Sequence, residues 1–173
     1  VMGGGVGISI HAPITIATEK TVFAMPEAKI GLFTDVAGGW FLSRLRNSLG
    51  YYLGLTSAQL RGEDVVKAGI AKYFVESSQL ENLQKDLEDL ANKNGPKENL
   101  EKEVYAILSN YSKQVSGEVP NENAIQNLFN KPSFSEIVEA LKEDTENKEF
   151  VEKTLKQIGA NSPLSMKVIF EQI

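Results

Sequence analysis

Hydrophobic and polar positions follow two different patterns along the chain. Up to residue 76, short apolar runs rich in β-branched and aromatic residues alternate with glycine and polar clusters. This pattern predicts strands over 14–18, 22–25 and 73–75, and helices over 40–45, 51–55 and 64–70. Thr56 with Gln59 has the spacing of a capping box, which predicts one more short helix over 57–61.

From residue 77 onward, apolar residues recur at helical spacing. Four leucines, at 80, 83, 87 and 90, predict a helix that closes at Asn94-Gly95-Pro96. Further helices are predicted over 100–111, over 150–158 and after two start signals, the Ser133/Glu136 capping box and Ser162-Pro163. We therefore expect an α/β piece at 1–76 and a helical region at 77–173.

Glycines are densest at the start of the chain, at Gly3-Gly4-Gly5 and Gly7. Alternation over 6–10 predicts a strand, whereas the glycines in front predict a helix N-terminus that faces a ligand, and the period alone does not decide. Glycine inside a regular element costs about 0.5–1 kcal/mol relative to alanine, so the run points to a ligand approaching bare backbone. A tight turn is the alternative.

Two carboxylates follow the glycine run, Glu27 in MPEAKIGLF and Asp35 in FTDVAGG. Pro26 places Glu27 on a connection, and both side chains could supply acid–base or nucleophilic chemistry. The alternatives are a solvated loop residue for Glu27 and a helix N-cap for Asp35.

Composition excludes several classes of function. A net charge of −5 argues against a nucleic-acid surface, and no apolar run reaches the roughly 18 residues that span a bilayer. The chain has no cysteine and one histidine, which excludes a structural zinc site and makes a catalytic metal site unexpected.

Several motifs in family order identify a resemblance. The segments MGGGVGISIH, ATEKTVFAMPEAKIGLFTDVAGGWFLSRL and LGYYLGLTSAQLRGEDVVKAGIAKYFV resemble the crotonase (enoyl-CoA hydratase/isomerase) superfamily, in particular its acyl-CoA hydrolase branch. The similarity continues to SPLSMK near residue 167. It implies an α/β fold, a spiral of ββα units that is partial here because its N-terminal half is absent, followed by a mainly helical region.

The resemblance also assigns roles. The segment after the glycine triplet would be a helix, and the Gly4 N–H would supply half of an oxyanion hole. Glu27 matches the catalytic glutamate that the hydrolases share with the hydratases, and Asp35 matches an aspartate typical of the hydrolases. Hydratases carry a second catalytic glutamate where this chain has Gly7, which argues against addition of water to a double bond.

The reaction implied by this resemblance is hydrolysis of 3-hydroxyisobutyryl-CoA to 3-hydroxyisobutyrate and CoA, a step of valine breakdown in the mitochondrial matrix. Glu27 would attack the thioester or activate a water, Asp35 would orient the substrate hydroxyl or assist proton transfer, and coenzyme A would enter only as part of the substrate. Phe23, Met25, Ile30, Leu32 and Phe33 would keep the surroundings of Glu27 apolar.

Two departures accompany the match: the family usually has proline and glycine where this chain has Thr34 and Ala37. The chain also opens at Val1 without a preceding strand, so we expect a piece cut within a fold. The second oxyanion donor and most of the CoA surface would lie upstream, and this piece alone should be inactive. The rival hypotheses are a hydratase or isomerase and an inactive piece that self-associates as a homo-oligomer.

Other residues are expected to be structural. His11 is expected to be a packed or capping residue, and Arg44 and Arg46 to lie on a solvated helix face, although either arginine could approach a CoA phosphate. Packing roles are expected for Trp40, Tyr51 and Tyr52.

Overall fold

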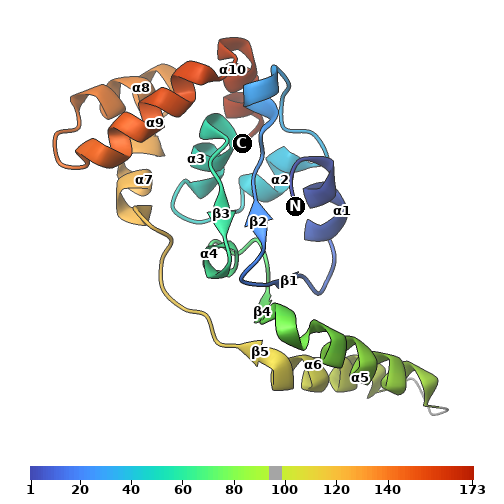
Figure 1. Cartoon of the computed structure of the whole chain (residues 1–173). Helices are drawn as coiled ribbons and strands as arrows, with labels where there is room; N and C mark the ends of the chain where they lie inside the picture. Colours follow the sequence, from blue (N-terminus) through green and yellow to red (C-terminus); the bar gives the residue numbers. More distant parts are fainter. Residues whose placement is uncertain (94–98) are drawn as a thin grey trace.

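The computed structural model describes residues 1–93 and 99–173. Ten α-helices lie within these residues (Figure 1), together with two short 3₁₀ helices, η1 (Glu27–Ile30) and η2 (Ser77–Gln79). The helices are α1 (Gly4–Ile10), α2 (Gly38–Leu42), α3 (Leu49–Thr56), α4 (Glu63–Lys67), α5 (Leu80–Asn92), α6 (Leu100–Tyr111), α7 (Glu122–Phe129), α8 (Phe134–Glu143), α9 (Lys148–Ala160) and α10 (Pro163–Gln172). None of the helices described is long and apolar enough to cross a membrane.

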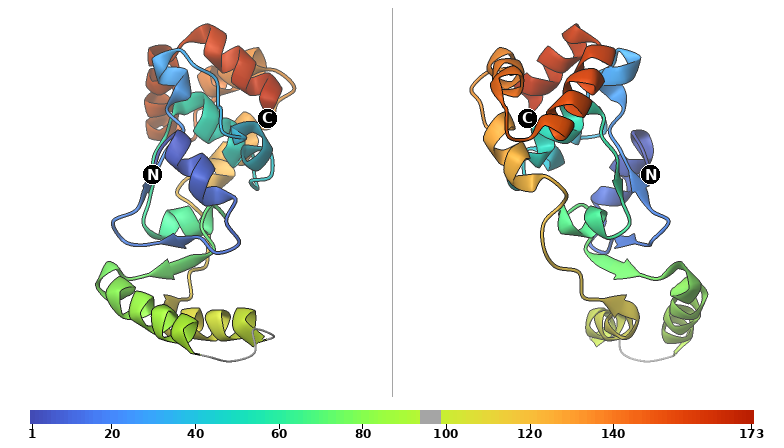
Figure 2. Two further views of the ribbon diagram at one scale, coloured as in Figure 1. Left: turned by 90° about the vertical axis from the view of Figure 1, so that its right-hand side faces the viewer. Right: turned by 60° about the vertical axis from the view of Figure 1, so that its left-hand side comes forward.

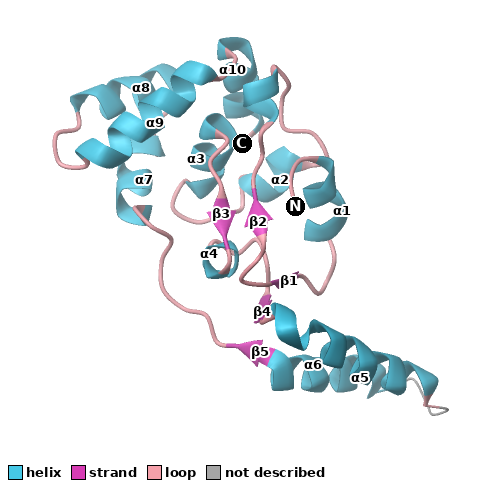
Figure 3. Ribbon diagram, in the orientation of Figure 1, coloured by secondary structure: helices cyan, strands magenta, loops and turns pink. Residues whose placement is uncertain are grey.

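The strands are short and lie between helices (Figure 3). They are β1 (Ile16–Ala17), β2 (Val22–Phe23), β3 (Leu60–Arg61), β4 (Tyr73–Val75) and β5 (Ser112–Lys113). β1 pairs in parallel with β4, which pairs antiparallel with β5, and β2 pairs antiparallel with β3. The α/β class expected from the sequence is confirmed.

The predicted helix over 57–61 is wrong. Thr56 is the last residue of α3, and its hydroxyl donates back to the Tyr52 carbonyl and accepts from the Ala58 N–H. Ser57 then takes a left-handed backbone, with φ of 56°, which ends α3. The chain continues as β3, in which Leu60 lies opposite Phe23 of β2.

The C-terminal helices follow their start signals. Ser133 Oγ accepts from the Glu136 N–H at 3.2 Å, and Ser162 Oγ accepts from the Ser165 N–H at 3.3 Å with Pro163 opening α10. α7 has no counterpart among the predicted helices. The predicted end of α5 at 94–96 lies outside the described residues.

The main core draws on both parts of the chain. α3 contributes three fully buried leucines, and the apolar faces of α7 to α10 surround it (Figure 2). The N-terminus of α10 is also tied to η1, because the Ser162 N–H donates to the Ala28 carbonyl at 2.9 Å. The division expected at residue 76 stays a prediction, whereas this core crosses it.

α5 and α6 form a hairpin that projects from the body (Figures 1 and 2). A second, smaller core joins the hairpin to β4, with Val75, Leu83 and Leu108 buried. These leucines are part of the helical pattern that predicts the two helices.

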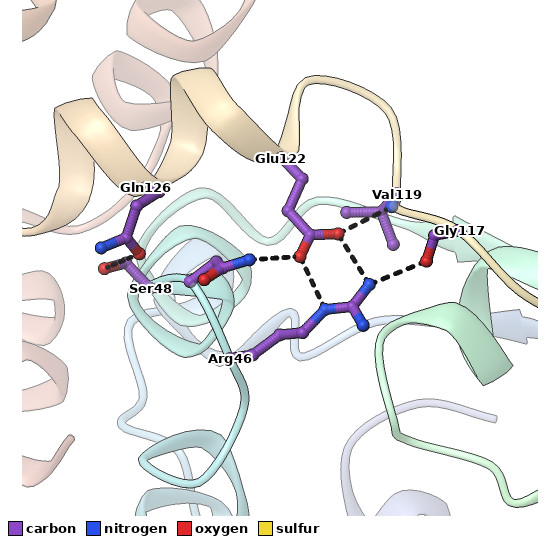
Figure 4. A network of polar contacts seen from close by, with 7 residues as sticks. Arg46, Ser48, Gly117, Val119, Glu122 and Gln126 are labelled. Atoms are coloured by element: carbon purple, nitrogen blue, oxygen red, sulfur yellow. Dashed lines mark hydrogen bonds and ion pairs between the residues drawn. The ribbon is translucent and has the colours of Figure 1, made fainter.

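An ion pair between the half-exposed Arg46 and the buried Glu122 fastens α7 to the loop before α3 (Figure 4). The Glu122 side chain is fully buried and accepts from Arg46 Nε at 2.6 Å, Arg46 Nη2 at 3.0 Å, Asn47 Nδ2 at 2.7 Å and the Val119 N–H at 2.8 Å. Burial alone would raise the pKa of Glu122, but these hydrogen bonds lower it below its ordinary value. Arg46 therefore does not lie on a solvated helix face, contrary to expectation.

Loss of the arginine should be costly, because it leaves a buried carboxylate without its counter-charge. We expect Arg46→Ala to lower the free energy of unfolding by about 3 kcal/mol, near the lower end for breaking a buried pair because half of Arg46 is in solvent. Urea denaturation measures this. The matched control is Arg61→Ala, which removes an exposed arginine and should change stability by no more than about 0.5 kcal/mol. Equal effects of the two variants would contradict the role of the pair.

Candidate active site

The Glu27 carboxylate lies against the glycine run. Glu27 opens η1 directly after Pro26, and its side chain is buried, with 4% of the residue exposed. A side-chain carbon built on Gly3 would lie 3.2 Å from Glu27 Oε1. Gly3 has φ of 49° and ψ of −125°, a conformation that L side chains rarely adopt, so glycine is required on both counts. The solvated-loop alternative for Glu27 is wrong.

The environment of Glu27 makes its carboxyl a stronger base than an ordinary glutamate. Burial raises the pKa of its carboxyl, and the Asp35 carboxylate adds to the rise, while the backbone N–H of Glu27 itself opposes it. Glu27 Oε2 is buried and has no hydrogen-bond partner among the described residues. Buried polar atoms normally find a partner, so this oxygen is available to a water or a substrate.

Gly4 is the first residue of α1, where a helix N–H has no acceptor within the helix. The next two N–H groups are used, from Gly5 to the Met2 carbonyl and from Val6 to the Gly3 carbonyl. Gly4 is exposed, and a side-chain carbon built on it would meet nothing within 4 Å, so no side chain packs against this position. The helix that the resemblance implies at this point is confirmed, and the strand alternative for 6–10 is wrong.

Asp35 lies on the exposed loop between η1 and α2. The two residues that follow it have left-handed backbones, with φ of 47° at Val36 and 60° at Ala37, each of which costs about 1–3 kcal/mol when held by its surroundings. Ala37 is a position at which the family usually has glycine. Asp35 does not cap α2 through its side chain, because the N-cap is Ala37 and no side-chain cap bond is formed.

Contacts on both sides hold this strained loop. Val36 packs on α1, where a side-chain carbon on Gly7 would lie 2.2 Å from Val36 Cβ. On the other side, the buried Thr34 hydroxyl donates to Gln172 Oε1 of α10 at 3.1 Å. Asp35 is thereby fixed between the first and last helices.

The predicted residues Gly4, Glu27 and Asp35 thus belong to one neighbourhood. Glu27 lies at the start of α1, and Asp35 is near enough to act on its charge. Of the apolar residues expected around Glu27, Phe23 and Met25 are buried, whereas Ile30, Leu32 and Phe33 are half or more exposed. A partly open cavity of about 220 Å³ beside α1 is lined by Val6, Ile10 and Phe23 among others, and neither carboxylate lines it.

Sequence reasoning missed Gln172 as a neighbour of the site. It lies 138 residues from Thr34, on a helix predicted only from its start signal, and no local pattern links the two positions. Thr34 itself differs from the usual proline of the family, and its hydroxyl now has an observed partner.

Comparisons with known proteins show which family and which proteins this chain resembles. A family model described as enoyl-CoA hydratase/isomerase matches residues 1–173. Proteins named "3-hydroxyisobutyryl-CoA hydrolase, mitochondrial" from Gallus gallus and Homo sapiens are 45% and 42% identical over 99% of this chain. The chain spans 44% of the length of each of these relatives.

Solved structures agree with the fold. A carnitinyl-CoA dehydratase from Mycobacterium thermoresistibile matches 99% of this chain and 47% of its own, with a TM-score of 0.81 and 26% identity. An enoyl-CoA hydratase from Rhodobacter sphaeroides matches 98% of this chain and 45% of its own, with a TM-score of 0.79 and 30% identity. The resemblance and the partial crotonase-like fold expected from the sequence are confirmed.

The raised pKa of Glu27 has a consequence for stability. The folded protein keeps the Glu27 carboxyl protonated to a higher pH than the unfolded chain does. The contribution of this carboxyl to the free energy of unfolding is therefore fully present below the ordinary pKa of 4.5, and it is lost as the pH rises through the raised pKa. Glu27→Gln cannot ionise. We expect the stability of the parent protein to fall relative to this variant as the pH rises above 4.5.

Urea denaturation over this pH range, with both proteins in the same buffers, measures the difference. Glu139→Gln removes an exposed carboxylate on α8 and is the control, for which the difference should stay flat. A difference between the parent and Glu27→Gln that does not change with pH would contradict the buried state of Glu27.

Proposed function

Since the chain belongs to the enoyl-CoA hydratase/isomerase family, we propose that the whole protein hydrolyses 3-hydroxyisobutyryl-CoA to 3-hydroxyisobutyrate and CoA. The observation that carries this proposal is the buried Glu27 carboxyl beside the exposed glycines at the start of α1, with Oε2 lacking a hydrogen-bond partner among the described residues. The names of the similar proteins support the substrate, a place in valine catabolism and a mitochondrial location. No cofactor is needed beyond the coenzyme A that the substrate carries.

The proposed mechanism begins with the thioester carbonyl at the Gly4 N–H. A donor aimed at the developing oxyanion is worth about 2.7–4 kcal/mol in other acyl-transfer enzymes. Glu27 either attacks the carbonyl carbon or removes a proton from a water that does so, and both routes remain open. When water attacks, collapse of the tetrahedral intermediate breaks the C–S bond, forms the free acid and releases CoA as the thiolate, which takes the proton held by Glu27. When Glu27 attacks, the same collapse leaves an acyl–Glu27 anhydride. A water then hydrolyses this anhydride to the free acid and the Glu27 carboxylate, and the proton released passes to the thiolate.

Asp35 has a supporting role in this proposal. The charge of Asp35 contributes to the raised pKa of Glu27, and its carboxylate accepts hydrogen bonds, so it suits the hydroxyl of a 3-hydroxyacyl group or the relay of a proton. The strained backbone after Asp35 is held by Val36 and Thr34, which limits how far this carboxylate can move. Such restraint favours orientation of the substrate over loose binding.

Hydration of an enoyl-CoA is the second candidate, because both structural neighbours are named for hydratase or dehydratase activity. Family resemblance places the second hydratase glutamate at the position of Gly7. In this fold Val36 fills that volume, since even one added carbon would lie 2.2 Å from Val36 Cβ. This packing favours the hydrolase.

Steady-state assays of the full-length protein on 3-hydroxyisobutyryl-CoA test the proposal. We expect Glu27→Gln to lower kcat by about 10²–10⁴-fold, because the variant removes the base or nucleophile. Asp35→Asn should lower kcat by a smaller factor, about tenfold, because it keeps the shape and loses the charge. Glu139→Gln should match the parent. Near-normal turnover by Glu27→Gln, or faster hydration of an enoyl-CoA than thioester hydrolysis, would contradict the assignment.

Residues 1–173 by themselves are proposed to be inactive. Gly4 supplies one oxyanion donor, whereas an oxyanion hole usually combines two or more. Exposed apolar side chains such as Ile8, Ile30 and Leu164 favour self-association of this piece. The thioester assay and sedimentation on residues 1–173 measure both properties, and turnover close to that of the full-length protein would refute this part of the proposal.

A further inference from the structure

A second cavity lies at the other end of α1 from Glu27. It has a volume of about 390 Å³ and lies between the end of α1, α2 with the turn after it, and the turn before β4. Ligand sites commonly fall between about 300 and 1,000 Å³. The seven residues of α1 rise about 10 Å, so this cavity is separate from the glycine end of the helix.

The side chains at this cavity are cationic and aromatic. His11, Trp40, Arg44 and Lys72 line it with the apolar Phe41 and Ile70, and no aspartate or glutamate is among its lining residues. In a chain with a net charge of −5, a cavity with two permanent positive charges and no carboxylate is a local exception.

Both cations keep donors for a ligand. Arg44 Nη1 donates to the Trp40 carbonyl at 2.6 Å and to Ser43 Oγ at 3.4 Å, and Lys72 Nζ donates to the Pro13 carbonyl at 2.7 Å. A guanidinium has five N–H donors and an ammonium has three. Within the described residues, Arg44 Nε and Nη2 have no acceptor. The Arg44 guanidinium and the Lys72 ammonium are therefore each held by a backbone carbonyl and still have N–H groups that a ligand can use.

Trp40 supplies a flat surface at this cavity. It is 56% exposed, so its expected packing role is wrong. The Arg44 guanidinium lies 4.1 Å from the centre of its ring, and the His11 ring lies 5.7 Å away at an interplanar angle of 55°. The faces of an indole ring attract cations and flat rings. The Trp40 ring already holds the Arg44 guanidinium, which is the group that would bind an anion.

We propose that this cavity binds a flat ring carrying a phosphate, of the class of a nucleoside monophosphate. The ring would lie on the face of Trp40 that Arg44 does not cover, with His11 at its edge, and the phosphate would accept hydrogen bonds from Arg44 and Lys72. Arginine suits phosphate because its fork of donors matches the oxygens. This site is distinct from the thioester site at Glu27 and does not depend on the proposed hydrolase activity.

Titration of the full-length protein with AMP, followed by calorimetry, tests the proposal. We expect saturable binding that Arg44→Gln and Lys72→Gln each weaken about tenfold, since each removes charge-assisted hydrogen bonds. Trp40→Leu should also weaken binding. Lys20→Gln, which removes an exposed lysine outside the cavity, is the matched control and should bind as the parent does. Thermal unfolding checks that each variant is folded.

Further titrations show which part of AMP is recognised and whether its site is separate from that of CoA. Adenosine, which lacks the phosphate, and ribose 5-phosphate, which lacks the ring, should each bind more weakly than AMP. AMP should bind equally well in the presence of saturating CoA. Absence of saturable AMP binding, binding by the folded Arg44→Gln and Lys72→Gln variants as tight as that of the parent, or competition by CoA would overturn the proposal. Loss of thioester hydrolysis by itself would bear only on the function proposed for Glu27.

Discussion

Close packing of α1 on the segment that carries both carboxylates depends on two missing side chains. Gly3 leaves room for the Glu27 carboxylate, and Gly7 leaves room for the side chain of Val36. Gly3 is the N-cap of α1, and Gly7 lies one turn further along the helix. A side chain at either position would separate the helix from Glu27 or from the Asp35 loop, and the backbone of Gly4 would lose its neighbours.

This arrangement is unfavourable locally and is stabilised from a distance. A buried carboxyl oxygen, Glu27 Oε2, that has no partner in residues 1–93 and 99–173 costs free energy, and so do the two left-handed residues after Asp35. They are held by the body of the protein, through the bond from Thr34 to Gln172 and the bond from Ser162 to Ala28. The C-terminal helices therefore act on the site without supplying a reacting group.

Much of this fold could be predicted from local patterns. Leucine spacing predicted α5, and cap signals predicted α8 and α10, because these helices bury one face and begin at a strong cap. α7 was missed because its first residue, Glu122, is charged and buried, which reverses the usual meaning of a polar residue. The helix predicted at 57–61 was wrong because pairing of β3 with β2 outweighed a weak cap signal.

The candidate site was predictable for a different reason. Gly4, Glu27 and Asp35 lie within the first 35 residues, so motif spacing was enough to select them as candidates. What could not be predicted was burial and long-range contact. Nothing near Arg46 in the sequence points to Glu122, and nothing near Trp40 shows that its ring stays exposed beside His11 and Lys72.

The projecting α5–α6 hairpin has its own small core, which is shared with β4 rather than with α1 or η1. A segment packed in this way forms a local cooperative unit, whose opening need not require opening of the rest. Substitutions within the hairpin therefore have little effect on the rest of the structure. Replacements that loosen Leu83 or Leu108 would be absorbed in the hairpin, leaving the geometry around Glu27 free to be maintained by selection on other residues.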